Sequence, residues 1–397
     1  MSGVTGDIKK LFNFKYKTRN DSITDQYNRV YMVKAMLVAA FLTGMKWYKD
    51  PIRCVIPKNM DSSTLSSYGP ESCWINGFYV YKELRHLQNF QGYYGLPNRA
   101  EQNGTNIYSG RPCVANKHDT SCKPLTKMFY LQYQWFPFYL ATLALLFYLP
   151  YIWHRYVNND LLTLKSCIKS QSPDIDDIVH NYFSNYINAP NQQNMKIILN
   201  IMIKVSYLLV NVLSFVFTDS VLNGDFRRFG TNWIRWSLLR NSMAHNYVGL
   251  RTTIKPGEML LPTFGFCDIM EMGADKIHHV GNNLTSVCEL SQHVLYHYVL
   301  MAIWFLLVLG MVVSVIGIGL LLFQYIYRTV MFGKCEVAAM RVFSVLTIRQ
   351  GEYLDFIRKK NVPVYGALIR KLYAAKFGSR ASSEAESTMK EMESPNL

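Results

Sequence analysis

The clearest pattern along the chain is two long runs of residues without an acidic or basic side chain other than histidine. One run covers the 26 residues 128–153, and the other covers the 38 residues 290–327. A membrane-spanning helix needs roughly 20 apolar residues to cross about 30 Å of hydrocarbon. Helices of soluble proteins keep a polar face and are rarely apolar all round over this length. Both runs are therefore predicted to span a membrane.

Two shorter runs are weaker candidates. The run 31–48 contains Lys34 and Lys46 near its ends, where a long side chain reaches the headgroups. A lysine that faces a water-filled path is the alternative interpretation. The run 205–218 has 14 uncharged residues, or about 21 Å of helix, and a soluble helix is its alternative. We predict four spans, at 30–48, 128–154, 204–222 and 293–327.

Four spans divide the rest of the chain into six segments. The basic N-terminal arm lacks the continuous apolar stretch of a cleavable signal peptide. The C-terminal region contains a series of apolar residues that predicts a helical domain, with a calmodulin-type target helix as the minor alternative. The last residues are small, polar and charged, which predicts a disordered tail. The segments are the arm 1–29, the first loop 49–127, the loop 155–203, the second loop 223–292, the helical region 328–377 and the tail 378–397.

Cysteines indicate which loops face outside. Six of the eight lie in the first and second loops, and the other two, Cys167 and Cys335, lie on the opposite side. Disulfides persist outside the cell, whereas cytosolic thiols stay reduced. We therefore predict two extracellular loops and cytoplasmic N- and C-termini. Six cysteines allow fifteen connectivities, so their pairing stays open. Zinc is the competing interpretation, but neither loop has a close CxxC spacing. The six are Cys54, Cys73, Cys113, Cys122, Cys267 and Cys288.

Several local features add to this plan. Asn103 and Asn283 stand in Asn-x-Thr tripeptides of the two outer loops and are candidate glycosylation sites. The stretch 59–72 predicts a polar, turn-rich tip, and 79–90 predicts a short helix. In the last run, the small residues at 310, 314 and 317 share one helical face and predict a packing surface. Because that run is too short for two crossings, we expect one long helix that projects from the membrane.

The sequence contains no catalytic constellation. It has no Walker loop, dinucleotide fingerprint, nucleophile elbow or HExxH motif, so we expect no enzyme activity, cofactor or bound metal. His293 and His297 are four residues apart on a predicted helix; a metal or pH-sensing site is one interpretation, and hydrogen-bonded structural histidines are the favoured one. The net charge of +15 is spread over both sides, which indicates contact with anionic lipids rather than nucleic acid.

Three stretches carry a resemblance to a known family. Residues 133–136 read YQWF, 148–150 read YLP, and 48–54 lead from the first span to the first outer cysteine. They resemble the innexin family of invertebrate gap-junction proteins, whose YYQWV signature opens the second span; here Phe136 replaces the valine. The four spans and two cysteines per outer loop agree with the family over nearly the whole chain. The signature residues are Tyr133, Gln134, Trp135, Pro137 and Pro150.

The resemblance also implies a disulfide pattern. Four cysteines match those of the family and are expected to join the two outer loops, and we predict the nested pairing Cys54–Cys288 and Cys73–Cys267. Cys113 and Cys122 go beyond the family pattern and are predicted to form an extra bridge inside the first loop. The fold class implied is an all-α polytopic membrane protein. It has four transmembrane helices, two disulfide-bonded extracellular loops with small α/β content, and a helical cytoplasmic domain.

The function implied is that of a gap-junction channel at cell–cell contacts of the plasma membrane. Subunits form a ring, expected to be an octamer, which docks with a ring on the adjacent cell, made of the same chain or of other innexins. Ions and small metabolites pass through the pore. An undocked release channel, like the related pannexins, and a four-span adhesion scaffold without a pore are the alternatives. The predicted pore-lining residues are Met1, Ser2, Asp25, Lys34, Lys46 and Asp50; the predicted docking tip is Asn59, Met60, Asp61, Ser62 and Ser63.

Overall fold

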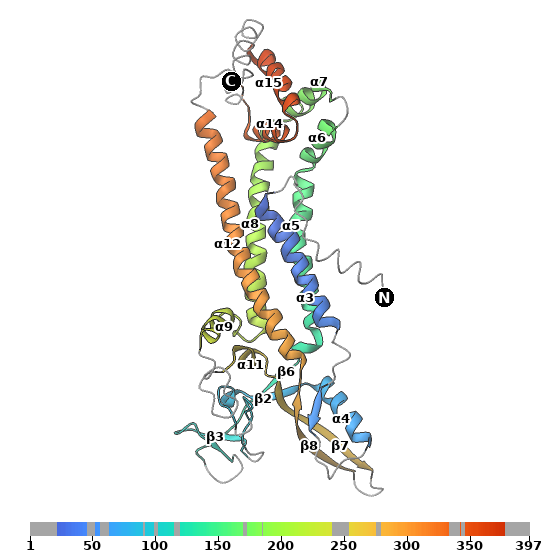
Figure 1. Ribbon diagram of the computed structural model, residues 1–397, viewed down its shortest axis with the longest axis vertical. Helices are drawn as coiled ribbons and strands as arrows, with labels where there is room; N and C mark the ends of the chain where they lie inside the picture. The colour runs from blue at the N-terminus through green and yellow to red at the C-terminus, as the bar shows by residue number, and fades with distance from the viewer. Residues whose placement is uncertain are drawn as a thin grey trace. The chain divides into compact units, whose positions relative to one another are not determined.

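The structure is a computed structural model whose described residues form two compact units. The first unit contains residues 31–145 and 211–309, and the second contains 22–30, 146–210 and 310–377. Three long helices contribute residues to both units (Figure 1). The described residues are 22–45, 52–55, 63–89, 92–98, 102–114, 120–169, 173–184, 186–239, 254–274, 279–332, 342 and 346–377.

The long helices are α5 (Gln132–Val157), α8 (Pro190–Val221) and α12 (Gln292–Phe332). Within the described part of the chain, these are the helices long and apolar enough to cross a membrane, α12 up to Tyr327. They lie where spans at 128–154, 204–222 and 293–327 were predicted. The single helix α12 has 41 residues, which confirms one long helix instead of two crossings.

The first predicted span, 30–48, is described only as far as Met45. It begins within the π-helix η1 (Tyr27–Met32), which follows α2 (Ile23–Gln26), and continues as α3 (Val33–Met45). The helix α3 has 13 described residues, or about 20 Å of α-helix, and it continues the helical stretch that begins at Ile23.

A buried ion pair explains why α8 extends beyond its uncharged run. Lys204 Nζ lies 2.6 Å from both carboxylate oxygens of Asp25 and 2.6 Å from Ser22 Oγ. Both charged side chains are largely buried. An unpaired charge is unfavourable inside a membrane helix, so the partner on α2 is what allows Lys204 to lie within α8.

The small-residue face of α12 packs within the chain. Asn28 Nδ2 donates to Ser314 Oγ at 3.0 Å. A Cβ atom on Gly317 would lie 2.6 Å from Thr24 Oγ1, so a glycine is needed for the observed approach of α2. Small residues allow helices to approach closely in lipid, and here the neighbour that approaches is the helical stretch before α3.

The first unit contains a five-stranded antiparallel sheet in the order β1-β8-β7-β2-β6. A smaller sheet has the order β4-β3-β5. The prediction of a short helix at 79–90 is wrong: aromatic and β-branched side chains of β2 pair with β6 and β7, and only the 3-10 turn η3 (Lys82–Leu84) follows. The strands are β1 (Arg53–Val55), β2 (Phe78–Tyr81), β3 (Gly104–Asn106), β4 (Pro112–Cys113), β5 (Cys122–Pro124), β6 (Lys127–Tyr130), β7 (Phe264–Ala274) and β8 (His279–Glu289).

Three helices accompany the sheet in the first unit. They are α4 (Ser63–Asn76), α9 (Phe229–Ser237) and α11 (Pro256–Leu260). The prediction of a turn-rich tip is therefore wrong from Ser63 onward, where α4 begins. On α9, a Cβ atom at Gly230 would lie 2.1 Å from the indole ring of Trp304, so α9 and α12 approach each other at a position that only glycine permits.

The second unit has a helical core of its own. Its elements are α6 (Asn159–Lys169), α7 (Ile175–Ile178), η4 (Val179–Phe183), α14 (Ile348–Lys360) and α15 (Val362–Phe377). Leu354 and Ile357, which belong to the apolar series noted in the sequence, are fully buried in this core. A calmodulin-type target needs such residues to be free, so the helical-domain prediction agrees better with the structure. The buried core residues also include Leu164, Ile168, Ile178, Phe183, Val342, Tyr353, Val364, Leu368, Leu372 and Tyr373.

A buried arginine ties α14 to the start of α6. The Arg349 side chain is fully buried, and its Nη2 donates to Asp160 Oδ1 and to Asn158 Oδ1, both at 2.8 Å. Its Nη1 donates to Glu352 Oε2 at 2.6 Å. Lys196 of α8 adds a second cation 3.0 Å from Asp160 Oδ2. The network thus joins three segments that are far apart in the sequence.

The glycine contacts give a first prediction. Gly230→Ala should lower stability by about 1–3 kcal/mol, because the added methyl overlaps the Trp304 ring. Gly366→Ala is the matched control: Gly366 also lies inside a helix, α15, but nothing lies within 4 Å of an added Cβ, so it should raise stability by about 0.5–1 kcal/mol. Thermal unfolding midpoints of the purified variants measure both; equal midpoints for the two would contradict the packing of α9 on α12.

A second prediction concerns Asp160. Burial raises the pKa of its carboxyl, but Arg349, Tyr353 and Lys196 outweigh burial and hold the pKa below its ordinary value. The ionised carboxylate therefore stabilises the fold above the unfolded-state pKa of about 3.9, and this contribution disappears as pH falls through the lowered pKa. Asp160→Asn should remove this acid dependence and destabilise the protein by about 1.5–3 kcal/mol, since Arg349 and Lys196 lose a hydrogen-bonded carboxylate while Arg349 keeps Glu352 as its remaining anion.

Thermal unfolding between neutral pH and pH 3 tests this prediction. Glu71→Gln is the control, because Glu71 is exposed and its neutralisation should leave the midpoint unchanged. If Asp160→Asn unfolds at the same temperature as the Glu71 variant at neutral pH, the network does not stabilise the second unit.

Candidate functional site: the disulfide-linked loops

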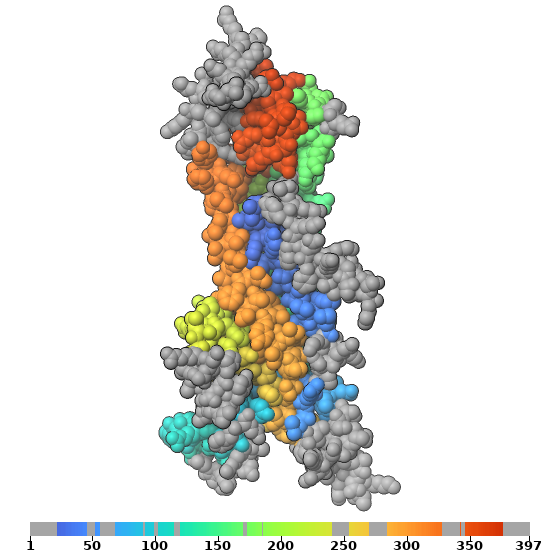
Figure 2. Space-filling view, viewed as in Figure 1, coloured from blue at the N-terminus to red at the C-terminus, as the bar shows by residue number. Residues whose placement is uncertain are grey.

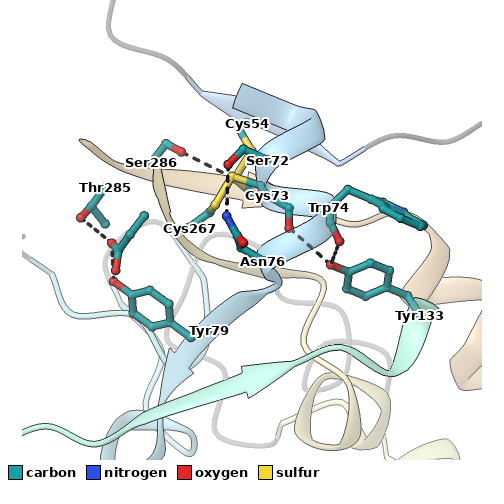
Figure 3. Close-up of a disulfide and its surroundings, with 12 residues drawn as sticks. Cys54, Ser72, Cys73, Trp74, Asn76, Tyr79, Tyr133, Cys267, Thr285 and Ser286 are labelled. Atoms are coloured by element: carbon teal, nitrogen blue, oxygen red, sulfur yellow. Dashed lines mark hydrogen bonds between the residues drawn. A yellow bond between two sulfur atoms is a disulfide. The ribbon is translucent and has the colours of Figure 1, made fainter. Parts of the chain in front are cut away.

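Two disulfides join the two predicted outer loops. Cys54 of β1 is bonded to Cys288 of β8, its direct partner across the sheet, and Cys73 of α4 is bonded to Cys267 of β7 (Figure 3). They link positions 234 and 194 residues apart. This is the nested pairing that the family resemblance implied. Crosslinks over such long separations strongly restrict the unfolded chain.

The remaining cysteines agree with the division into bonded and free thiols. Cys113 and Cys122 form a third disulfide that links β4 to β5 beside β3. Cys167 is in no disulfide, and Cys335 lies outside the described residues. The sulfur atoms of Cys54, Cys73 and Cys288 lie within 4.8 Å of one another. All three are in disulfides, so they offer no thiolate to a metal such as zinc.

The signature residues Tyr133 and Gln134 hold the end of α4. Tyr133 Oη donates to the carbonyl of Trp74 at 2.6 Å (Figure 3). Gln134 Nε2 donates to the same carbonyl at 2.7 Å and to that of Ile75 at 3.0 Å. The last carbonyls of a helix have no partner inside the helix. The signature supplies these partners beside Cys73, so it fixes the turn that carries a loop-joining disulfide.

The proline of the signature has a compensating contact. Pro137 lacks the N–H that would bond to the carbonyl of Tyr133, four residues earlier. That carbonyl instead faces the hydroxyl of Tyr296 on α12, 3.5 Å away. Gly44 of α3 lies close to the proline ring itself, since a Cβ atom on Gly44 would be 3.8 Å from Pro137 Cβ. The helix α5 runs on through both Pro137 and Pro150.

Aromatic rings connect the sheet to the spans. The ring of Phe78 on β2 stacks on Tyr130 at 6.0 Å and on Tyr133 at 6.4 Å between centroids. Phe136 packs on Tyr296 at 4.5 Å. Trp135 is partly buried and meets Tyr139 edge-on. Such ring pairs add to the stabilisation from buried area, so the head of α5 is packed on two sides.

The histidines of α12 are structural. His293 Nδ1 donates to the carbonyl of Pro262 at 2.7 Å, and His297 Nε2 donates to that of Leu261 at 2.6 Å. Both rings are fully buried. A Cβ atom on Gly257 would lie 2.4 Å from His297 Nδ1, which leaves no room for an ion on that side. Hydrogen bonding to neighbours, the favoured prediction, is confirmed.

A carboxylate joins four strands of the sheet. Asp268 of β7 accepts hydrogen bonds from Tyr79 Oη at 2.9 Å and Thr285 Oγ1 at 2.8 Å, and its Oδ2 lies 2.6 Å from Lys127 Nζ. Lys127 also lies 4.2 Å above the Tyr79 ring. Burial raises the pKa of Asp268, but Lys127 and the two hydroxyl donors lower it below the ordinary value overall. Nothing in the sequence pattern indicated this cluster.

Few of the predicted pore-lining and docking residues are described. Lys34 lies partly buried on α3. Asp25 is 6% exposed and binds Lys204 of α8; its expected role at the pore wall stays a prediction. Ser63 is the first residue of α4. Met1, Ser2, Lys46, Asp50, Asn59, Met60, Asp61 and Ser62 lie outside the described residues.

The glycosylation candidates lie on strands or beside them. Asn103 is partly exposed immediately before β3, and its backbone carbonyl accepts from the N–H of Leu125 at 2.6 Å. Asn283 lies on β8, opposite Met270 of β7. Asn103 therefore lies just before the start of β3 and is partly exposed at the surface.

Comparison with known proteins agrees with this geometry. The innexin family model matches residues 21–374, which includes both outer loops and all three long helices. The chain belongs to the innexin family. It is also 21% identical over 245 residues to innexin inx3 of Drosophila melanogaster. That match covers 60% of this innexin and 55% of the relative, so the chain matches about half of the relative's length.

The signature contacts generate a third prediction. Tyr133→Phe and Gln134→Leu should each lower stability by about 1 kcal/mol, because each leaves a carbonyl at the end of α4 with fewer donors. The double variant should also form the Cys73–Cys267 disulfide less completely, measured by peptide mapping without reduction. Tyr108→Phe is the control, since Tyr108 is 89% exposed. Unfolding midpoints equal to the control would show that the signature does not hold α4.

Proposed function

We propose that this innexin is a subunit of a gap-junction channel. Subunits assemble into a ring in the plasma membrane, and two rings dock between adjacent cells to pass ions and small metabolites. The observation that carries the proposal is the pair of disulfides Cys54–Cys288 and Cys73–Cys267, which fasten both outer loops to one sheet. Docking of ordered loops loses less conformational entropy than docking of flexible ones.

The spans support a conduit formed between subunits. Several polar groups within the described helices have partners inside the chain: Lys204 pairs with Asp25, Asn28 with Ser314, and Tyr139 with Thr218 at 2.5 Å. A transporter keeps ionisable groups at a substrate site near the midplane. Because these polar groups are already paired with each other, they are not available to bind a solute inside one chain. This favours a pore formed between subunits over a transporter site within one subunit.

The pore wall is proposed to come from the N-terminal arm and the first span. In this proposal the segment 30–48 completes a set of four spans with both termini in the cytoplasm, and eight subunits form the ring. The arm then forms the narrowest part, and diameter and lining charge set selectivity. The proposed lining residues are Met1, Ser2, Lys34, Lys46 and Asp50.

An undocked release channel is the second candidate. Asn103 favours the release channel, because it is a partly exposed residue of the first unit. A glycan on Asn103 at the docking face would obstruct a second ring. The docked proposal instead places the contact at the tip Asn59–Ser63, whose last residue begins α4.

The fourth prediction separates these functions. Paired cells that express the wild-type chain should show junctional conductance, and single cells should show large unitary currents. Replacing 59–63 with Gly and Ser should abolish junctional conductance while unitary currents persist, because docking is lost and the pore is kept. Asn103→Gln is the control and should leave both currents unchanged.

Each other outcome points elsewhere. Wild-type unitary currents without junctional conductance, gained on Asn103→Gln, would favour the release channel. Absence of unitary currents from the purified wild-type protein in bilayers would favour a scaffold without a pore. Retained coupling in the 59–63 variant would remove the docking role of the tip.

A further inference from the structure

A basic cavity lies between α9 and α11 in the first unit. It has a volume of about 760 Å³ and is lined by the turn before α9, the first part of α9, and α11. Three of the lining residues are arginines, Arg227, Arg228 and Arg235, and Thr231 and Asn232 add polar groups between them. The cavity therefore combines guanidinium donors with neutral polar side chains.

Among the residues that the structure describes, no acidic side chain neutralises the arginines of this cavity. None of the three arginine side chains makes an ion pair with a residue that the structure describes, and all three are exposed. The carboxylate in the lining belongs to Asp225, which already lies 2.5 Å from Arg85 Nη2. Arg85 also donates to the carbonyl of Met259. The Asp225 carboxylate is thus already paired with Arg85. The three arginines of the lining are therefore available to bind an anion from outside the chain.

The cavity is attached to the ends of two spans. The helix α9 follows shortly after α8 ends at Val221. Its buried face packs on α12: Trp233 lies 5.9 Å from Tyr298 between ring centroids, and Trp304 Nε1 donates to the carbonyl of Arg227 at 3.4 Å. Figure 2 shows α9 standing out beside α12. These contacts hold α9 against α12, close in sequence to the end of α8.

The outer face of α9 has the character of an interfacial helix. Ile234 is 45% exposed and Leu238, four residues on, is 80% exposed, and Arg235 stands between them. Lys255 lies over the rings of Trp233 and Tyr298 at 5.8 and 5.5 Å. Helices with apolar, aromatic and basic residues in this arrangement lie at the boundary of headgroups and acyl chains, where indole rings are favoured.

We propose that this cavity binds the phosphate of an anionic phospholipid headgroup. Arg227, Arg228 and Arg235 donate charge-assisted hydrogen bonds to the phosphate oxygens, for which the planar guanidinium is well suited. Ile234 and Leu238 contact the acyl chains of the same lipid. A free phosphate has no apolar part for these two side chains, so the arrangement favours a lipid. The proposal is independent of pore formation or docking.

Lipid binding to the purified, delipidated full-length protein in detergent tests the proposal. Native mass spectrometry measures the affinity for phosphatidylglycerol, for phosphatidylcholine and for inorganic phosphate. Phosphatidylglycerol should bind more tightly than the other two. The triple variant Arg227→Gln, Arg228→Gln, Arg235→Gln should bind it roughly tenfold or more weakly, since three charge-assisted contacts are removed. Ile234→Ser with Leu238→Ser should weaken lipid binding while the arginines remain.

A matched control removes the same charge elsewhere. Arg358, Lys359 and Lys360 are exposed at the end of α14, and their replacement by Gln should leave the affinity for phosphatidylglycerol unchanged. Unfolding midpoints show that each variant is folded, and Arg228→Gln alone provides a milder change. Equal weakening in the control, binding of inorganic phosphate as tight as that of lipid, or unchanged lipid binding with loss of the oligomer in the triple variant would each overturn the proposal. The last result would make this face a contact between subunits.

Discussion

Two disulfides that bridge distant parts of the chain determine how the sheet of the first unit is built. Cys54 and Cys288 face each other across β1 and β8, and Cys73 fastens α4 to Cys267 on β7. Strands from both loops then share one sheet. The signature at the start of α5 stabilises the end of α4, because the side chains of Tyr133 and Gln134 donate hydrogen bonds to carbonyls of its last turn. The head of a membrane helix and the loop crosslinks are therefore parts of one arrangement.

The membrane helices follow a second constraint, that polar groups in an apolar setting need partners. Lys204 and Asp25 neutralise each other. Asn28 bonds to Ser314 on the face of α12 where small residues let the neighbouring helix approach closely. At Pro137 the carbonyl that proline leaves without its usual donor faces a tyrosine of α12. Each of these contacts joins a different pair of helices, so satisfying the polar groups also sets which helices are neighbours.

Features that depend on local composition were predictable, and those that depend on distant partners were not. The long charge-free runs gave α5 and α12, and cysteine placement separated bonded from free thiols in the described chain. The disulfide pairing came from family resemblance, since spacing alone leaves fifteen connectivities. The strand β2 was mistaken for a helix because its partners, β6 and β7, are remote in sequence. Likewise, the ion pair of Asp25 with Lys204 joins residues far apart in the sequence and could not be assigned from local composition.

The central claim is that the loop-joining disulfides form the frame on which two rings dock. Junctional conductance between paired cells tests it most directly, with surface expression measured in parallel. We expect Cys54→Ser with Cys288→Ser to abolish conductance in protein that reaches the surface. Cys113→Ser with Cys122→Ser, which removes a bridge within one loop, should retain it. Full conductance without the Cys54–Cys288 bond, or loss of conductance only when the Cys113–Cys122 bond is removed, would contradict the account.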